Sequence, residues 1–236
     1  MPYLQIPNIS CRVYGVSLGI LAVGTIEDGK ESPKFPACRG EDDIIGLQIG
    51  VLFAYARELS GFQVSGLENH AVNVPFGVQV AGFGNSVENE IGLGLQLSLA
   101  MNDCASGAGL QMAIVNEADK NFTGVQLGLC NWGAGKSEWI ESSHEVQDGR
   151  LQSHGHHSNS HQGVDDMRGL QLGLVNKASD MYGVQCGILY NRAKCVRGLQ
   201  LGLINVTDSM AGIQIGLLNV IKENRVPFLP VINAHF

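Results

Sequence analysis

Hydrophobic and polar residues alternate along most of the chain in a phrase that recurs about every fifteen residues. Three copies read GLQLGLVN from Gly169, GLQLGLIN from Gly198 and GIQIGLLN from Gly212. Counted from the opening glycine, apolar residues occupy positions +1, +3 and +5, Gln occupies +2, and a small residue occupies +4. Alternation with a period of two is typical of a β-strand. Each copy therefore predicts a strand with one apolar face and one face of Gln and Gly.

Less regular copies extend this pattern through most of the chain. They open at Gly46, Gly61, Gly77, Gly94, Gly109, Gly124 and Gly183, with a degenerate copy, GVSLGIL, at Gly15. The spacing is 14 to 17 residues, apart from one gap of 45 residues between Gly124 and Gly169. The best copies have an Asn at +7 and then a short polar stretch, which predicts a turn. An apolar residue two positions before most opening glycines shifts the apolar alternation, so we expect the chain to bend at the glycine.

Two all-β architectures fit this repeat. In a β-solenoid each repeat forms one short coil of 14 to 17 residues, with the Leu positions inward and identical Gln and Asn side chains stacked between coils. In a closed antiparallel β-barrel of about 12 strands, the Leu face would contact lipid and the Gln face would line the lumen. The alternating C-terminal segment VPFLPVINAHF favours the barrel. The low aromatic content of 6%, the six cysteines and the repetition of one residue at one position favour the solenoid.

The repeat divides the chain into five stretches. We expect an N-terminal cap with the degenerate first repeat at 1–45, a repeat array at 46–131 and an inserted polar, His-rich loop at 132–168. The array continues at 169–220, and a C-terminal cap strand follows at 221–236. Such a cap covers the last open coil, which a repeat array needs to avoid an exposed edge.

Composition narrows the classes of function. Charged residues make up only 16% of the chain, the net charge is −7, and Lys and Arg form no cluster, so we expect no nucleic-acid partner. The chain has no run of eighteen apolar residues, so we expect no transmembrane helix. The six cysteines include no C-x-x-C pair, and Cys186 occupies an apolar position of the repeat. We therefore expect most of them to act as small apolar residues and not as a disulfide framework.

Two short motifs point weakly to enzymes. GVSLG matches a nucleophile elbow, but Ser17 occupies the Gln position of the repeat and no helix pattern follows. CNWGAGKS resembles a phosphate-binding loop, but Cys130 stands where the first glycine belongs. No set of nucleophile, base and orienting group can be assembled from the sequence. We therefore expect a non-enzymatic protein without catalytic or cofactor-binding residues.

Two groups of polar side chains are candidate binding sites. The insert contains the run HGHHSNSH, whose imidazoles could bind Zn, Ni or Cu weakly, although their spacing does not match a structural zinc site. These candidate ligands are His154, His156, His157 and His161. The Gln positions would form a polar stripe on the outside of a solenoid, either simply solvated or in contact with a protein or glycan partner. The candidates on this stripe are Gln48, Gln111, Gln126, Gln171, Gln200 and Gln214.

The phrases GLQIG, GLQMAIVN, GVQLGLCN, GLQLGLVN, GLQLGLIN and GIQIGLLN, with VYGVSLGIL before them and GLLNVIKENRVPFLPVINAHF at the end, resemble a bacterial family of surface-repeat proteins often described as lipoproteins. The resemblance covers the chain from about residue 13 to the end, apart from the gap. It implies a surface location and brings no established activity and no catalytic residue. The chain differs from that family in its insert and in its first residues, MPYLQIPNIS, which have neither the features of a signal peptide nor a lipidated Cys.

Together these observations predict a repeat protein that acts as a structural scaffold or a recognition surface for an unidentified protein or glycan. We expect it at the bacterial cell surface or outer membrane if an export signal has been removed, and in the cytoplasm otherwise. The alternatives are a small outer-membrane β-barrel or pore, and then metal binding through the His-rich loop. The pattern specifies no oligomeric state.

Overall fold

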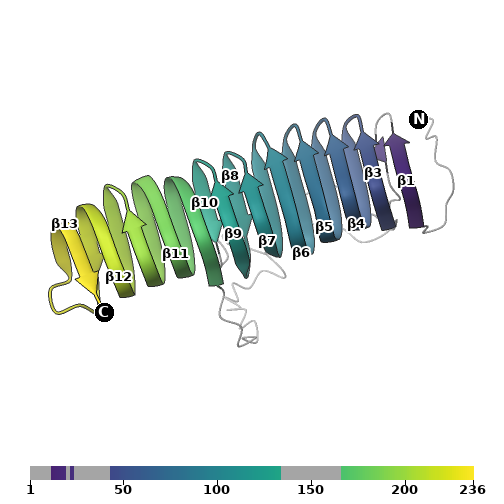
Figure 1. Ribbon diagram of the computed structural model, residues 1–236. Helices are drawn as coiled ribbons and strands as arrows, with labels where there is room; N and C mark the ends of the chain where they lie inside the picture. The colour runs from purple at the N-terminus through teal and green to yellow at the C-terminus, as the bar shows by residue number, and fades with distance from the viewer. Residues whose placement is uncertain (1–11, 20–21, 24–42, 134–165) are drawn as a thin grey trace, which may run out of the picture.

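The repeats wind into a β-solenoid of about nine turns, in which each coil pairs with the next along the axis (Figure 1). The computed structural model describes residues 12–19, 22–23, 43–133 and 166–236. The strands are β1 (Arg12–Gly19), β2 (Ala22–Val23), β3 (Asp43–Gly50), β4 (Phe53–Ser65), β5 (Glu68–Ala81), β6 (Gly84–Ser98), β7 (Met101–Met112), β8 (Val115–Ala118), β9 (Phe122–Leu127), β10 (Cys130–Gly133), β11 (Asp166–Leu201), β12 (Ile204–Ile221) and β13 (Phe228–His235).

The pairing of these strands decides between the two architectures. Neighbouring coils pair in parallel from β1 to β12, and only β13 runs antiparallel to its neighbour. β1 and β13 lie at opposite ends of the strand order. The predicted all-β solenoid with one coil per repeat is therefore confirmed, and the closed antiparallel barrel is wrong.

Each coil has two parts, which we name by their polar residue. The Gln segment runs from the opening glycine to position +4, and the Asn segment runs from the Asn to the residue before the next opening glycine. In the coil that opens at Gly169, the buried side chains are Gln171, Asn176, Ala178 and Met181. The interior is thus lined by one Gln, one Asn, one small residue and one larger apolar residue per coil.

The hydrophobic core consists of two columns on the inner side of the Asn segments. One column holds the larger side chains two positions before the next coil begins, and these are Ile44, Leu59, Phe122, Met167, Met181, Val196 and Met210. The other column holds mostly small residues, which are Ala56, Ala71, Val87, Cys104, Ala118, Ala178 and Ala193. Narrow side chains in the second column allow the two walls of the coil to approach closely.

The Leu positions of the Gln segment point outward, so the prediction that they form the core is wrong. Leu170 and Leu172 are partly exposed, whereas Gln171 between them is fully buried. The buried apolar residue before the glycine and the buried Gln after it are four positions apart, an even number, so alternation places both on the same side. The same side of the strand therefore faces inward before and after the glycine, and the expected shift in alternation does not occur on the inner side of the coil.

The insert does not interrupt the stack of coils. β9 and β10 pair directly with β11, with Gln126 opposite Gln171 and Asn131 opposite Asn176. The strands extend further into the expected loop than its bounds of 132–168 allow, because β10 continues to Gly133 and β11 begins at Asp166. Residues 134–165 lie outside the described part of the chain.

At the C-terminal end, β13 lies against the last coil, where the sequence places a cap (Figure 1). Two features hinder the pairing of a further strand with β13. Pro230 has no backbone N–H, and Val231 has a φ of 71°, which interrupts the extended geometry near a register shift. The stack therefore ends in a strand that is a poor template for continued pairing.

The outward orientation of Leu172 is testable by substitution. Because its side chain points outward and is partly exposed, Leu172→Asp is expected to lower the free energy of unfolding by less than about 1 kcal/mol. Met181→Ala is the matched comparison within the same coil, and loss of its buried side chain is expected to cost about 2–3 kcal/mol. Urea unfolding in dilute solution, followed by circular dichroism, measures both. Unfolding of the Leu172→Asp variant would show that this position is buried after all.

Candidate functional site

The Gln side chains form one continuous ladder inside the solenoid. In every described coil from Gln63 to Gln214, Nε2 donates a hydrogen bond to Oε1 of the Gln in the preceding coil, at 2.7–3.0 Å. An amide is both donor and acceptor, so identical copies can bond above and below without water. The ladder therefore buries a polar residue in every coil at little cost in unmade hydrogen bonds.

The expectation that these glutamines form an outward recognition stripe is wrong. All six candidates are at most 1% exposed, and these are Gln48, Gln111, Gln126, Gln171, Gln200 and Gln214. Their amides are engaged with neighbouring coils, and some also donate to backbone carbonyls, as Gln48 does to Tyr55 at 2.9 Å. These side chains consequently hold the coils together and do not face a ligand.

A second ladder is formed by the Asn side chains and has the opposite polarity. Each Nδ2 from Asn69 to Asn205 donates to Oδ1 of the Asn in the following coil, at 2.8–3.1 Å. The Gln donors point toward the N-terminal end of the stack and the Asn donors toward the C-terminal end. The amide dipoles of the two ladders therefore oppose one another along the axis.

Each ladder ends on an acceptor for which the described residues supply no donor. At one end, Oδ1 of Asn69 is buried and unpartnered, because Ala54 occupies the ladder position in the preceding coil. At the other end, Oε1 of Gln214 is buried and unpartnered, because β13 brings no Gln into that position. The hydrogen-bond pattern thus specifies both the direction and the ends of the stack.

Outside the Gln ladder lies a broad hydrophobic surface, which we call the apolar face. It consists of the outward side chains at positions +1 and +3 of the Gln segments: Leu47, Ile49, Phe62, Val64, Val78, Val80, Leu95, Leu97, Leu110, Met112, Val125, Leu127, Leu170, Leu172, Val184, Cys186, Leu199, Leu201, Ile213 and Ile215. All of them are at least partly exposed, and Phe62 reaches 56%. No Gln segment contains Asp, Glu, Lys or Arg.

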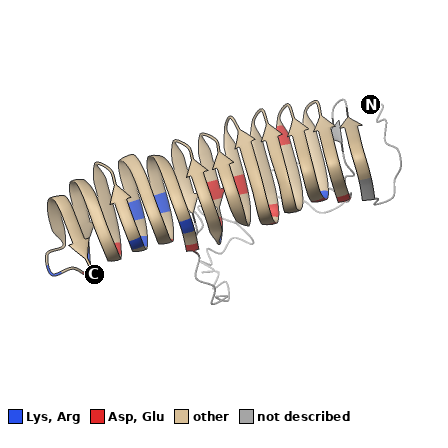
Figure 2. Cartoon of the chain, in the orientation of Figure 1, with Lys and Arg blue, Asp and Glu red and all other residues tan. Residues whose placement is uncertain are grey.

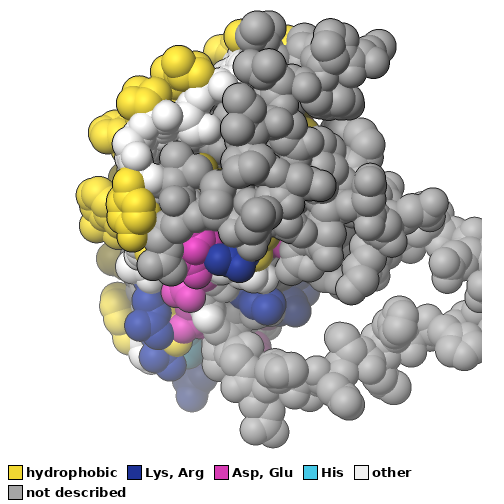
Figure 3. Space-filling model, turned by 90° about the vertical axis from the view of Figure 1, so that its right-hand side faces the viewer, with side chains coloured by type: hydrophobic (Ala, Val, Ile, Leu, Met, Phe, Trp, Pro, Cys, Tyr) yellow, Lys and Arg dark blue, Asp and Glu magenta, His cyan; other side chains and the backbone are white. Residues whose placement is uncertain are grey.

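Hydrophobic residues also continue the apolar face around the adjacent turn. Leu99, Ile114, Leu129 and Leu203 lie at position +5 and are exposed. Viewed from the β1 end, hydrophobic side chains gather along one side and the top of the molecule, and charged side chains gather below them (Figure 3). The solenoid therefore presents one apolar side and one charged side.

The charged residues are distributed unevenly along the axis. Residues 43–133 contain eight acidic and two basic side chains, a net charge of −6, whereas residues 166–236 contain four acidic and seven basic side chains, a net charge of +3. Figure 2 shows most acidic residues between β3 and β8 and most basic residues on β11. The side chains of the Asn segments thus give the two halves of the solenoid opposite charge.

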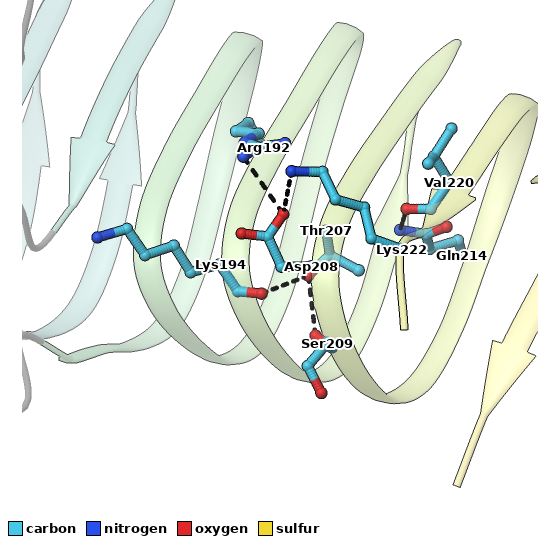
Figure 4. Close-up of polar contacts among 8 residues, drawn as sticks. All are labelled: Arg192, Lys194, Thr207, Asp208, Ser209, Gln214, Val220 and Lys222. Atoms are coloured by element: carbon cyan, nitrogen blue, oxygen red, sulfur yellow. Dashed lines mark hydrogen bonds and ion pairs between the residues drawn. The ribbon is translucent and has the colours of Figure 1, made fainter. Parts of the chain in front are cut away.

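Ion pairs on the charged side connect successive coils near the C-terminal end (Figure 4). Oδ1 of Asp208 lies 2.7 Å from Nζ of Lys222 and 3.4 Å from Nη2 of Arg192. Beside them, the buried Thr207 occupies a position that is Ala193 in the preceding coil, and its hydroxyl lies 3.0 Å from the carbonyl oxygen of Lys194. The ion-paired side chains remain 29–55% exposed, so each pair contributes at most about 1 kcal/mol.

Cys104 and Cys195 are expected to differ in chemical reactivity. Cys104 is buried, and desolvation, followed by the charges of Asp103 and Asp119, raises the pKa of its thiol well above the ordinary range. Cys195 is exposed, and desolvation, followed by a hydrogen bond with Asp180, also raises its thiol pKa. A raised pKa means less thiolate at neutral pH, and the thiolate is the reactive form.

We therefore expect iodoacetamide to modify Cys195 slowly at pH 7 and faster as the pH rises, and to leave Cys104 unmodified in the folded protein. Peptide mass spectrometry after timed labelling measures both rates. The internal control is labelling in guanidinium chloride, where both cysteines should react at the rate of an ordinary thiol. Equal labelling of the two residues in the folded protein would contradict the burial of Cys104.

The remaining candidates from the sequence are placed as follows. Four candidate metal ligands lie outside the described residues, and these are His154, His156, His157 and His161. Among the described residues, no group of three or more His, Cys, Asp or Glu is suited to a metal ion. Ser17 of the elbow-like motif lies in β1 opposite Gln48, at the Gln position of its coil. Across the described ranges there is also no helix of the length and hydropathy that crossing a membrane requires.

Comparison with known proteins identifies no relative. No protein-family model matches the chain, and neither the search of curated proteins nor the search of solved structures found a match.

Proposed function

We propose that the protein is a non-enzymatic scaffold that recognises a protein partner through its apolar face. The main supporting observation is that uncharged side chains point outward at positions +1 and +3 of every Gln segment from Leu47 to Ile215. The β-solenoid is compatible with a structural or recognition role. The surface proposed for recognition is thus the one that the sequence pattern assigned to the core.

The size of the apolar face supports a role in binding. About nine turns at a strand spacing of ~4.8 Å give a length of ~43 Å, and the five residues of a Gln segment give a width of ~16 Å. The resulting area of about 700 Å² exceeds the largest apolar patch of a typical monomer, roughly 300–600 Å². A contiguous patch of this size is typical of a surface that is covered in the working state.

The ladders behind the apolar face favour tight recognition. Gln side chains within the ladder are held by hydrogen bonds on both sides, as Gln111 is by Gln96 at 2.7 Å and Gln126 at 2.8 Å. The outward side chains beside them are therefore carried on a backbone that is already ordered before binding. Preorganisation reduces the conformational entropy lost on association.

The chemistry of the apolar face favours a protein over a glycan. Its outward side chains are aliphatic apart from Phe62, Met112 and Cys186, so it offers few hydrogen bonds to sugar hydroxyl groups. Burying those hydroxyl groups without partners would cost free energy. An apolar protein surface has no such penalty.

Site-specific photo-crosslinking in the cell that produces the protein tests this proposal. A photoreactive phenylalanine analogue replaces Leu110 on the apolar face or, as the matched control from the same repeat, Lys120 in the Asn segment. We expect covalent protein adducts from position 110 and few from position 120. Adducts from position 120 alone, or from neither position, would overturn the assignment of the apolar face as the recognition surface.

A further inference from the structure

We infer that the apolar face of one chain is covered by the same face of a second copy, so that the protein forms a face-to-face homodimer. This inference rests on the proposed function and names the partner. Three observations carry it: the repeat of the apolar face, its area and the distribution of charge around it.

The repeat makes the apolar face complementary to itself. Its side chains recur at the strand spacing, ~4.8 Å, along the entire stack. Two sheets pack face to face when the side chains of one fit between those of the other, with the sheets ~10 Å apart. A partner must match this repeat over the full length of the face, and a second copy of the chain has that repeat.

The area is sufficient for a stable dimer. With about 700 Å² per copy from the dimensions above, two copies bury about 1,400 Å² together. Stable protein–protein interfaces bury ~1,200–2,000 Å² in total. The exposed side chains of the turn, such as Leu129 and Leu203, would add to this area at one edge.

The charges disfavour a lipid surface as the alternative occupant. Neither the Gln segments nor the two turn residues that follow them contain Lys or Arg, so no basic side chain borders the face on that side to contact lipid headgroups. Residues 43–133 carry a net charge of −6 and residues 166–236 one of +3, so an anionic bilayer would attract only the C-terminal half and would repel the larger charge of the other half. Pairing with a second copy needs no basic border.

Face-to-face association is complete when two copies have paired. A two-fold axis in the plane of the interface brings the same face of both chains together, which is an isologous contact. In the described residues, the opposite side of each chain carries solvated ion pairs such as Asp208–Lys222. The association therefore stops at a dimer and does not continue into a filament.

Sedimentation velocity of the full chain, with light scattering after gel filtration, tests the inference. The wild-type protein is expected to have twice the mass of the 25.2 kDa chain. The variant L110E/L127E places carboxylates near the middle of the apolar face on both copies, and we expect its dissociation constant to rise at least 100-fold. Ser106→Glu, in an Asn segment, is the matched control and should remain dimeric.

Circular dichroism and thermal melting establish that each variant is folded, and L110Q/L127Q replaces the acidic variant if that one unfolds.

A dimeric wild type and control with a monomeric, folded apolar-face variant would support the inference. A wild type that is monomeric at high concentration, or a dimer that survives the apolar-face substitutions, would overturn it. Flotation of a monomeric wild type with phosphatidylcholine vesicles would instead identify lipid as the occupant. If the purified protein is monomeric but position 110 crosslinks to another protein in the cell, this inference fails and the proposed function stands. If position 110 forms no crosslink at all, both fail.

Discussion

Replacing Gln111 by Ala is expected to lower the free energy of unfolding by about 3–5 kcal/mol. The substitution leaves Oε1 of Gln96 without its donor and Nε2 of Gln126 without its acceptor, both inside the solenoid. Each unmade buried hydrogen bond costs roughly 1–3 kcal/mol, and the missing side chain leaves a cavity. Urea denaturation followed by circular dichroism measures the loss.

Gln214→Ala is the matched control because it lies at the end of the same ladder. Its Oε1 already lacks a donor within the described chain, so the substitution leaves only Oε1 of Gln200 newly unpartnered in the ladder. We expect about half the loss seen for Gln111→Ala. Equal losses at the two positions, or a loss below about 1 kcal/mol at Gln111, would show that the ladder does not hold the coils together.

Gly124→Ala is expected to destabilise the fold further, by more than about 5 kcal/mol, and to prevent accumulation of folded protein. Gly124 has a φ of +147°, which residues with a side chain rarely adopt, and a Cβ there would lie 2.0 Å from the carbonyl oxygen of Gly109 in the preceding coil. The clash is with backbone that is itself paired to a neighbouring coil, so it cannot move without breaking the stack. Soluble yield and far-ultraviolet circular dichroism measure the effect.

Gly15→Ala separates backbone strain from steric clash. Gly15 also has a positive φ, +112°, but a Cβ at this position meets no atom of the described residues within 4 Å. Only the conformational strain remains, which we expect to cost about 1–3 kcal/mol. A Gly124→Ala protein that melts with the wild type would refute the close approach of the two glycine backbones.

The orientation of the strands shows where hydrophobicity alone was an insufficient guide. The +1 and +3 positions are the most apolar in each repeat, so they were expected in the core, yet Leu170 and Leu172 lie outside. A signal for the correct orientation was present within the chain. Position +2 is Gln in ten successive copies, whereas +1 and +3 vary among Leu, Ile, Val, Phe, Met and Cys. Invariance of a polar residue is what a hydrogen-bonded ladder requires, and variation is what an outward apolar surface tolerates.

The recognition surface was therefore placed on the wrong side of the strand by the sequence pattern. The pattern correctly identified the repeat unit, the strands and the stacking of identical amides. It did not show that coils on either side of the insert are neighbours, because Gln126 and Gln171 are 45 residues apart and meet only through the parallel register of β9 and β11.

By itself, the sequence determined an all-β protein with one coil per repeat, since a period of two within a period of about fifteen is a local property of the chain. Only the tertiary structure decided which side of each strand is buried. An isolated coil would bury its Leu side chains and leave its Gln in water. Stacking reverses that preference, because each Gln amide then bonds to its copies above and below and loses little on leaving water. The apolar face becomes the outside as a consequence of association between coils, which no single repeat encodes.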